Sequence, residues 1–277
     1  MKKTLIAAAL LAAFANAQAF QSEGATTGGG TASGGVLDVG PTTFPDGHFH
    51  GPNGAPGVGF LNPSPGYIIS LQSIDSFSYK GTVTPAGGAA FRRYQLLNYT
   101  HTGPGGGGTI STDFNWFKIP TISQQVYFGI ATNPGTTTHT HDAFYVGDRT
   151  GHVVPTATTN YATVAVLAVP GTSSTALYNN LTGNLRYDVT AGTLKTATTT
   201  GVVSTLSGSG QTLAINANVN AAAGTFSGTS QHNGGTSVGS SVNGKFFGSG
   251  TTSAVAGIAK GGSGSGAYVA SFGGIKQ

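Results

Sequence analysis

The chain has 277 residues, of which only 7% are charged and 46 are glycine, and it contains no cysteine. The formal net charge of +4 is small and scattered without a basic run, which argues against a nucleic-acid partner. The lack of cysteine excludes a disulfide framework and an anchor on a lipidated cysteine. Stability must therefore come from packing and burial.

Residues 1–19 are typical of a secretory signal peptide. Two lysines follow the first methionine, and an apolar run over 5–15 comes next. This run is too short to span a bilayer, and small residues then favour cleavage after Ala19, with Ala17 as the alternative. We expect a secreted protein with no membrane anchor, and loss of the two lysines lowers its net charge to +2.

Beyond the signal peptide the pattern predicts an all-β chain. No window repeats apolar residues at helical spacing over three turns, and Gly, Thr, Ser and Asn favour turns and strands. Residues 20–43 form a Gly/Ser/Thr tract that we expect to be a flexible leader. Residues 44–155 are predicted to form an irregular, β-rich N-terminal clamp domain, and residues 156–277 a second domain.

The clamp domain begins with a loop rich in proline and glycine over 44–66. Alternating aromatic, branched and polar residues then predict strands separated by glycine-rich turns. We place these strands at 67–71, 77–83, 91–99, 114–119 and 125–130, and the segment 143–151, with turn residues at 147–148 and 150–151, closes the region.

From residue 156 onward aromatic residues become sparse, and Ala, Val, Thr, Ser and Gly alternate. About eight strand candidates follow one another there, which favours a closed, eight-stranded antiparallel β-barrel. Closure also removes the sheet edges that so few charges would leave unprotected.

Two His-x-His pairs are the strongest chemical signal. Four of the seven histidines lie in Gly47-His48-Phe49-His50-Gly51 and His139-Thr140-His141-Asp142. Imidazole is a common ligand for zinc, copper, iron and heme. Residues i and i+2 of an extended segment share a face, so the two histidines of each pair point the same way. We expect only one histidine of each pair to reach a metal. The alternative is that these histidines are ordinary surface residues of loops.

Several motifs in the second half of the chain resemble the hemophilin family of secreted hemophores from Gram-negative bacteria. They are Phe144–Gly151, Gly244–Gly248, Ala254–Ala259 and Ser271–Gln277. The C-terminal half is also similar, more distantly, to the barrels of transferrin-binding surface lipoproteins. The resemblance implies a clamp that binds heme b through histidine, followed by an eight-stranded barrel. It also implies export by a surface lipoprotein assembly modulator (type XI secretion), delivery to a TonB-dependent outer-membrane receptor, and host heme proteins as a source of heme.

A heme site needs an axial imidazole, apolar walls and partners for the propionates. We expect His50 and His139 as axial ligands, with His48 and His141 as alternates. Both together would give six-coordinate iron, and one alone would leave the sixth position open. The candidate walls are Phe49, Phe60, Tyr67, Trp116, Phe128 and Tyr145. The candidate propionate partners are Lys80, Arg92, Arg93 and Arg149, and only one of Arg92 and Arg93 can serve, because neighbours on a strand face opposite ways.

Enzyme chemistry has little support. The chain has a single glutamate, Glu23, and dispersed aspartates, so no carboxylate pair is evident. No nucleophile elbow or phosphate-binding loop precedes a helix. Three non-enzymatic alternatives stay open: a zinc or copper scavenger using the same pairs with Asp142, a structural or adhesive exoprotein, and an exoprotein that binds a host protein.

Overall fold

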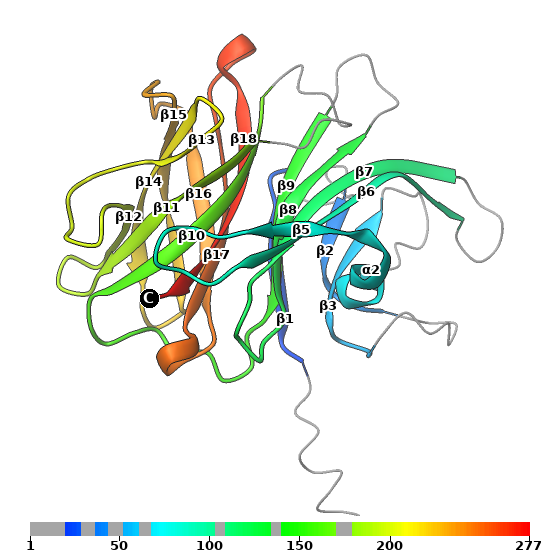
Figure 1. Cartoon of the computed structure of the whole chain (residues 1–277), viewed down its shortest axis with the longest axis horizontal. Helices are drawn as coiled ribbons and strands as arrows, with labels where there is room; N and C mark the ends of the chain where they lie inside the picture. The colour runs from blue at the N-terminus through cyan, green and yellow to red at the C-terminus, as the bar shows by residue number, and fades with distance from the viewer. Residues whose placement is uncertain are drawn as a thin grey trace, which may run out of the picture.

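A computed structural model describes residues 20–28, 37–43, 52–60, 68–102, 109–133, 140–169 and 179–277. The described part of the chain is mainly β-structure, as predicted, and has a barrel beside a six-stranded sheet (Figure 1). In the described part of the chain, no helix has the length and hydropathy needed to cross a membrane.

The C-terminal region forms the predicted closed, antiparallel eight-stranded barrel. Its strands follow the order β10-β18-β17-β16-β15-β14-β12-β11, and β10 pairs with β11 to close the cylinder. The short β13 (Leu206–Gly208) pairs with both β11 and β14. The barrel strands are β10 (Thr159–Ala168), β11 (Asn179–Asp188), β12 (Thr193–Thr196), β14 (Gln211–Asn220), β15 (Thr225–His232), β16 (Ser241–Phe247), β17 (Ala254–Gly261) and β18 (Tyr268–Lys276). Short 3-10 helices, η2 (Gly250–Thr252) and η3 (Gly264–Gly266), lie before β17 and β18.

Aromatic rings fill the interior of the barrel. Phe226 lies 5.8 Å from Phe246 and 6.1 Å from Phe272 between ring centroids, within a core of buried aliphatic residues. Two glycines make room for these rings: a Cβ on Gly244 would lie 2.1 Å from Phe226, and one on Gly257 would lie 2.6 Å from Phe272. The lumen is therefore a packed core.

In the N-terminal region, the described residues form two sheets and one helix. The six-stranded sheet has the order β1-β9-β8-β7-β6-β5, and a three-stranded sheet has the order β2-β3-β4. The strands of the larger sheet are β1 (Ser22–Thr26), β5 (Tyr79–Val83), β6 (Phe91–Thr102), β7 (Thr109–Lys118), β8 (Val126–Asn133) and β9 (Thr140–Asp148). The smaller sheet consists of β2 (Leu37–Pro41), β3 (Pro56–Phe60) and β4 (Ile68–Ser70), and α2 (Leu71–Ser78) follows it.

The structure corrects two expectations about this region. The segment 20–43 is not a leader without structure, because β1 pairs with β9 and β2 pairs with β3. The β1 pairing joins positions far apart in sequence, so local composition could not reveal it. The helix α2 was also not predicted, since its eight residues are too few to show three turns of helical periodicity.

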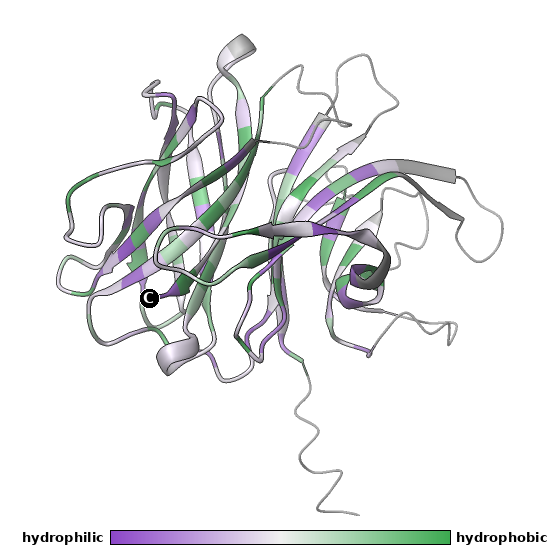
Figure 2. Cartoon of the chain, in the orientation of Figure 1, coloured by the Kyte–Doolittle hydropathy of each residue, from purple (hydrophilic) through white to green (hydrophobic). Residues whose placement is uncertain are grey.

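The central strands of the six-stranded sheet are buried on both faces. One face packs on the outer wall of the barrel, where Phe117, Phe128 and Tyr145 share a core with residues of β10, β17 and β18. The other face is covered by the three-stranded sheet and α2, with Trp116 and Phe144 in that second core. Figure 2 shows hydrophobic and hydrophilic residues interspersed along the strands of both parts. The sheet is thus a middle layer, and its barrel-facing side positions the candidate site.

Candidate functional site

The barrel-facing side of the six-stranded sheet changes from apolar to polar along the strands. Gln95 lies opposite Asn115, and Asp113 lies opposite Thr132, which lies opposite His141. Residues two apart on a strand share a face, so all these side chains lie on the side of Phe117 and Ile130, which contact the barrel. We call this group the barrel-facing patch; its members are Arg93, Gln95, Asp113, Asn115, Thr132 and His141.

Most of the patch is buried, and its residues Arg93, Gln95 and Asn115 have polar atoms without a hydrogen-bond partner in the described part of the chain. Arg93, Gln95 and Asn115 are each less than a tenth exposed. Among the described residues, no hydrogen-bond partner is found for Nε and Nη2 of Arg93, Nε2 of Gln95, or Nδ2 and Oδ1 of Asn115. Buried polar groups in folded proteins are nearly always hydrogen-bonded. Such a concentration on two neighbouring strands indicates a place that receives a polar ligand.

His141 is the patch residue with metal-binding chemistry. Its Nδ1 lies 2.8 Å from Oγ1 of Thr132, the residue directly opposite on β8. Histidine ligands of metals typically have one ring nitrogen held by such a hydrogen bond, which fixes the orientation of the ring. A bond from His141 to a metal would therefore use Nε2.

The other predicted ligands cannot be placed. His48, His50 and His139 lie outside the described residues, and His139 directly precedes the first residue of β9 in the chain. His152 and His232 have structural contacts: His152 lies against the Arg149 side chain, and His232 bonds Gln211 at the end of β15. Burial lowers the pKa of His232.

The aromatic residues proposed as pocket walls are core residues where the structure describes their side chains. Trp116 faces away from the barrel, stacks on Tyr94 at 5.3 Å and donates Nε1–H to Asp75 at 3.4 Å. Phe128 and Tyr145 are fully buried against the barrel wall. Phe49, Tyr67 and the side chain of Phe60 lie outside the described residues.

Asp75 anchors α2 on the face opposite the patch. Its carboxylate accepts hydrogen bonds from Trp116, from Lys118 Nζ at 3.2 Å and from the Tyr127 hydroxyl at 3.2 Å. Burial raises the pKa of Asp75 despite the neighbouring Lys118 ammonium. All three donors are directed at the Asp75 carboxylate, so this cluster holds the helix in place and its hydrogen bonds are used within the fold.

Of the four cations proposed as propionate partners, only Arg93 lies in the patch. Arg92 and Arg93 face opposite ways, and Arg92 and Lys80 are exposed. The side chain of Arg149 is instead hydrogen-bonded within the fold, which corrects its assignment as a propionate partner. Its Nη2 donates to the Ala223 carbonyl at 2.8 Å, and its Nη1 donates to Glu23 at 3.1 Å.

Arg149 connects the sheet with the barrel. It follows β9, and its guanidinium also reaches the carbonyls of Gly224 and Phe246 in the barrel, both at 3.4 Å. Glu23 on β1 pairs with Arg149 and with Lys245 on β16. Burial alone would raise the pKa of Glu23, but hydrogen bonds from Lys245 and Arg149 lower it below its ordinary value. The group joins the two parts of the molecule.

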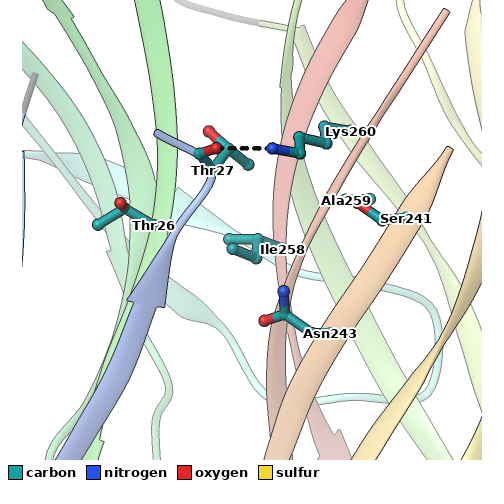
Figure 3. Close-up of a pocket in the computed structure, with 7 residues that line it drawn as sticks. All are labelled: Thr26, Thr27, Ser241, Asn243, Ile258, Ala259 and Lys260. Atoms are coloured by element: carbon teal, nitrogen blue, oxygen red, sulfur yellow. Dashed lines mark hydrogen bonds between the residues drawn. The ribbon is translucent and has the colours of Figure 1, made fainter. Parts of the chain in front are cut away.

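A second contact between the two parts lies at the other end of β1. Lys260 Nζ donates to the carbonyl of Thr27 at 2.9 Å across a cavity of about 50 Å³ that Asn243 and Ile258 also line (Figure 3). Such a volume holds only a few water molecules. This cavity is part of the junction between β1 and the barrel and is too small for a cofactor.

Within the described ranges, no group of three or more His, Cys, Asp or Glu side chains is arranged to hold a metal ion. Three of the four histidines of the His-x-His pairs lie outside those ranges. Histidine ligation by His50 and His139 therefore stays a prediction.

No protein-family model matches the chain. Among solved structures, transferrin-binding protein B from Haemophilus parasuis Hp5, a double mutant, is 13% identical with a TM-score of 0.42. The intact Ap-TbpB with N and C lobes is 12% identical with a TM-score of 0.32. Isotype 1 of transferrin-binding protein B from serogroup B Neisseria meningitidis is 14% identical with a TM-score of 0.31.

These matches span 79%, 79% and 87% of this chain, in the same order, and 48%, 48% and 51% of the other proteins. The chain thus spans about half the length of each of them. At such identities and TM-scores the similarity carries no functional conclusion.

Proposed function

We propose that the protein is a secreted hemophore that binds heme b through histidine and delivers it to an outer-membrane receptor for iron acquisition. The barrel-facing patch is the observation that carries this proposal. It combines an oriented imidazole on His141 with donors of Arg93, Gln95 and Asn115 that have no hydrogen-bond partner among the residues the structure describes. Heme iron takes an imidazole nitrogen as its axial ligand, and heme propionates accept such donors.

The axial ligands in this proposal are His50 and His139, with His48 and His141 as alternates. His139 and His141 are two residues apart, and His141 lies on the barrel-facing side of β9. Iron held by one histidine from each pair would be six-coordinate, whereas a single ligand would leave the sixth position open. The protein's own part is to orient the imidazoles and to exclude water around the porphyrin.

The partners follow from the same proposal. Export would use the surface lipoprotein assembly modulator, and the heme acceptor would be a TonB-dependent outer-membrane receptor. Host heme proteins would supply the heme. The mechanism is capture and transfer without catalysis.

A hemin titration of residues 20–277, followed by absorbance, tests the proposal. We expect a saturable one-to-one shift of the Soret band that is changed by His50→Ala or His139→Ala. His141→Ala is tested beside them, and His232→Gln on the barrel is the matched control that should leave the spectrum unchanged. A wild-type protein without a Soret shift would overturn the heme proposal, and zinc and copper titrations followed by a search for host-protein partners would then come next.

Release is proposed to require a shift of the six-stranded sheet away from the barrel when the receptor binds. The Glu23–Lys245 pair offers a way to prevent this shift, because a carbodiimide can join the amine and the carboxylate in contact. The apo-protein is cross-linked and then loaded with hemin, and Lys245→Gln treated in the same way is the control. Unchanged heme transfer to receptor-bearing membranes after cross-linking would contradict the proposed shift.

A further inference from the structure

Arg93 is a buried cation without a counter-ion among the described residues. It lies in β6 between Gly81 on β5 and Phe117 on β7, and its side chain is only 9% exposed. It takes part in none of the ion pairs seen in the described part of the chain. Asp113, the carboxylate of the patch, lies on β7 about four residues from Phe117, the residue opposite Arg93, which is roughly 14 Å along the strand.

Such a placement destabilises the protein unless something pairs with the charge. Burial lowers the pKa of Arg93. An arginine side chain nevertheless keeps its proton and its positive charge at physiological pH. A buried charge without a partner is among the most unfavourable features a core can contain. An apolar side chain of similar length would satisfy the packing around Phe91 and Phe117, so the guanidinium indicates an absent anion.

The unpaired atoms indicate which anion fits. The N–H bonds on Nε and Nη2 of a guanidinium run parallel along one edge, and this edge matches the two oxygens of a carboxylate. The amide nitrogens of Gln95 and Asn115 add two donors on the same face of the sheet, also without partners in the described structure. All these donors are neutral or cationic, as a carboxylate requires.

We propose that Arg93, Gln95 and Asn115 form a carboxylate-binding site, and that heme enters with a propionate directed at Arg93, inward toward the junction of sheet and barrel. The assignment of the carboxylate as a heme propionate rests on the proposed function. The inference adds the orientation of the porphyrin, with a propionate buried at the sheet, and it names Arg93 as the residue that selects a free carboxylate over its ester.

Metal-free protoporphyrin IX separates the carboxylate site from iron coordination, because it keeps both propionates and has no iron. Arg93→Met should weaken binding of protoporphyrin IX, followed by porphyrin fluorescence, by about 10- to 100-fold, the range of one lost charge-assisted pair. Arg93→Lys should keep part of the affinity. Arg92→Met, the exposed neighbour that faces the other way, is the matched control and should change nothing.

The dimethyl ester of heme gives the complementary comparison. Wild-type protein should bind hemin more tightly than the ester, and Arg93→Met should remove this preference without changing affinity for the ester. A preference that survives in Arg93→Met would overturn the inference while leaving the hemophore proposal intact. The hemophore proposal fails instead if wild-type protein gives no Soret shift with hemin.

The apo-protein provides a measurement that needs no porphyrin. If Arg93 is held for a ligand, apo Arg93→Met should melt at a higher temperature than apo wild type, because an unpaired buried charge is removed. If Arg93 has a structural partner, the same substitution should lower the melting temperature. A lowered melting temperature together with unchanged binding of protoporphyrin IX would overturn the carboxylate site.

Discussion

Replacing Arg149 by methionine should weaken the attachment of the six-stranded sheet to the barrel. Methionine keeps an unbranched apolar stem but removes every donor of the guanidinium. The carbonyls of Ala223, Gly224 and Phe246 would lose the guanidinium donor, and of these the Gly224 carbonyl would keep the N–H of Phe246. Glu23 would keep only Lys245. The perturbation thus acts on one junction and leaves the three hydrophobic cores unchanged.

The size of the effect follows from the contacts. A hydrogen bond from a charged donor contributes about 1.5 to 3 kcal/mol, and the contact at 2.8 Å to Ala223 is the strongest of those to the barrel. The two contacts at 3.4 Å are long and weaker. The Glu23 pair adds little, because the Glu23 side chain is 39% exposed and solvent screens it. We expect a loss of about 3 kcal/mol, or roughly 6 to 12 °C in melting temperature.

Urea unfolding followed by two probes tests this expectation. Fluorescence of Trp116, the single tryptophan of the chain, reports on the six-stranded sheet, and far-UV circular dichroism reports on both parts. We expect the two transitions to coincide in wild type and to separate in Arg149→Met. The control is Arg186→Met, since Arg186 donates to Asn160 and Thr199 within the barrel region. Coincident transitions, or a loss no larger than that of the control, would refute the role of Arg149 as a connection.

Two further outcomes are expected. Gly273→Ala should destabilise the protein by about 1 to 3 kcal/mol, because the new methyl group would lie 2.3 Å from Phe128 at the face between barrel and sheet. The control is Gly266→Ala, whose methyl group would meet open space. Equal melting temperatures of the two variants would contradict this packing. Glu23→Gln should lower the melting temperature at pH 7 but match wild type near pH 3. The pKa of Glu23 is lowered in the folded state, so its stabilisation is present above the unfolded pKa and is lost as the pH falls through the folded pKa. A difference that persists at pH 3 would show that the charge of Glu23 is not its cause.

The barrel could be predicted from sequence because its strands follow one another and alternate regularly between turns. The strand β1 could not, since its partner β9 lies more than a hundred residues away and Glu23 finds its cations only after the two parts meet. The helix α2 is too short for its periodicity to be seen.

The candidate site was predictable only in part. Because Arg92 and Arg93 are neighbours on a strand, the sequence predicts that one of them faces inward. It does not predict which of the two faces the barrel. Gln95 and Asn115 were not singled out, because a polar residue on a strand ordinarily faces solvent. Their burial becomes evident only when the cross-strand register places them side by side on the barrel-facing side of the sheet. Trp116, Phe128 and Tyr145 were expected around a ligand and turned out to be the packing that supports the sheet.

The last strand, β18, imposes an order on assembly. It closes the barrel against β10, and its Phe272 fills the interior while Ser271 donates from the opposite side of the strand to the carbonyl of Phe144. The surface on which the six-stranded sheet rests is therefore incomplete until β18 has been made and paired. Contacts between such distant positions form slowly, and the edges of β10 and β17 stay exposed in the meantime. When the chain emerges N-terminus first, β1 and β5 to β9 must wait for β18 before the sheet has a place to dock.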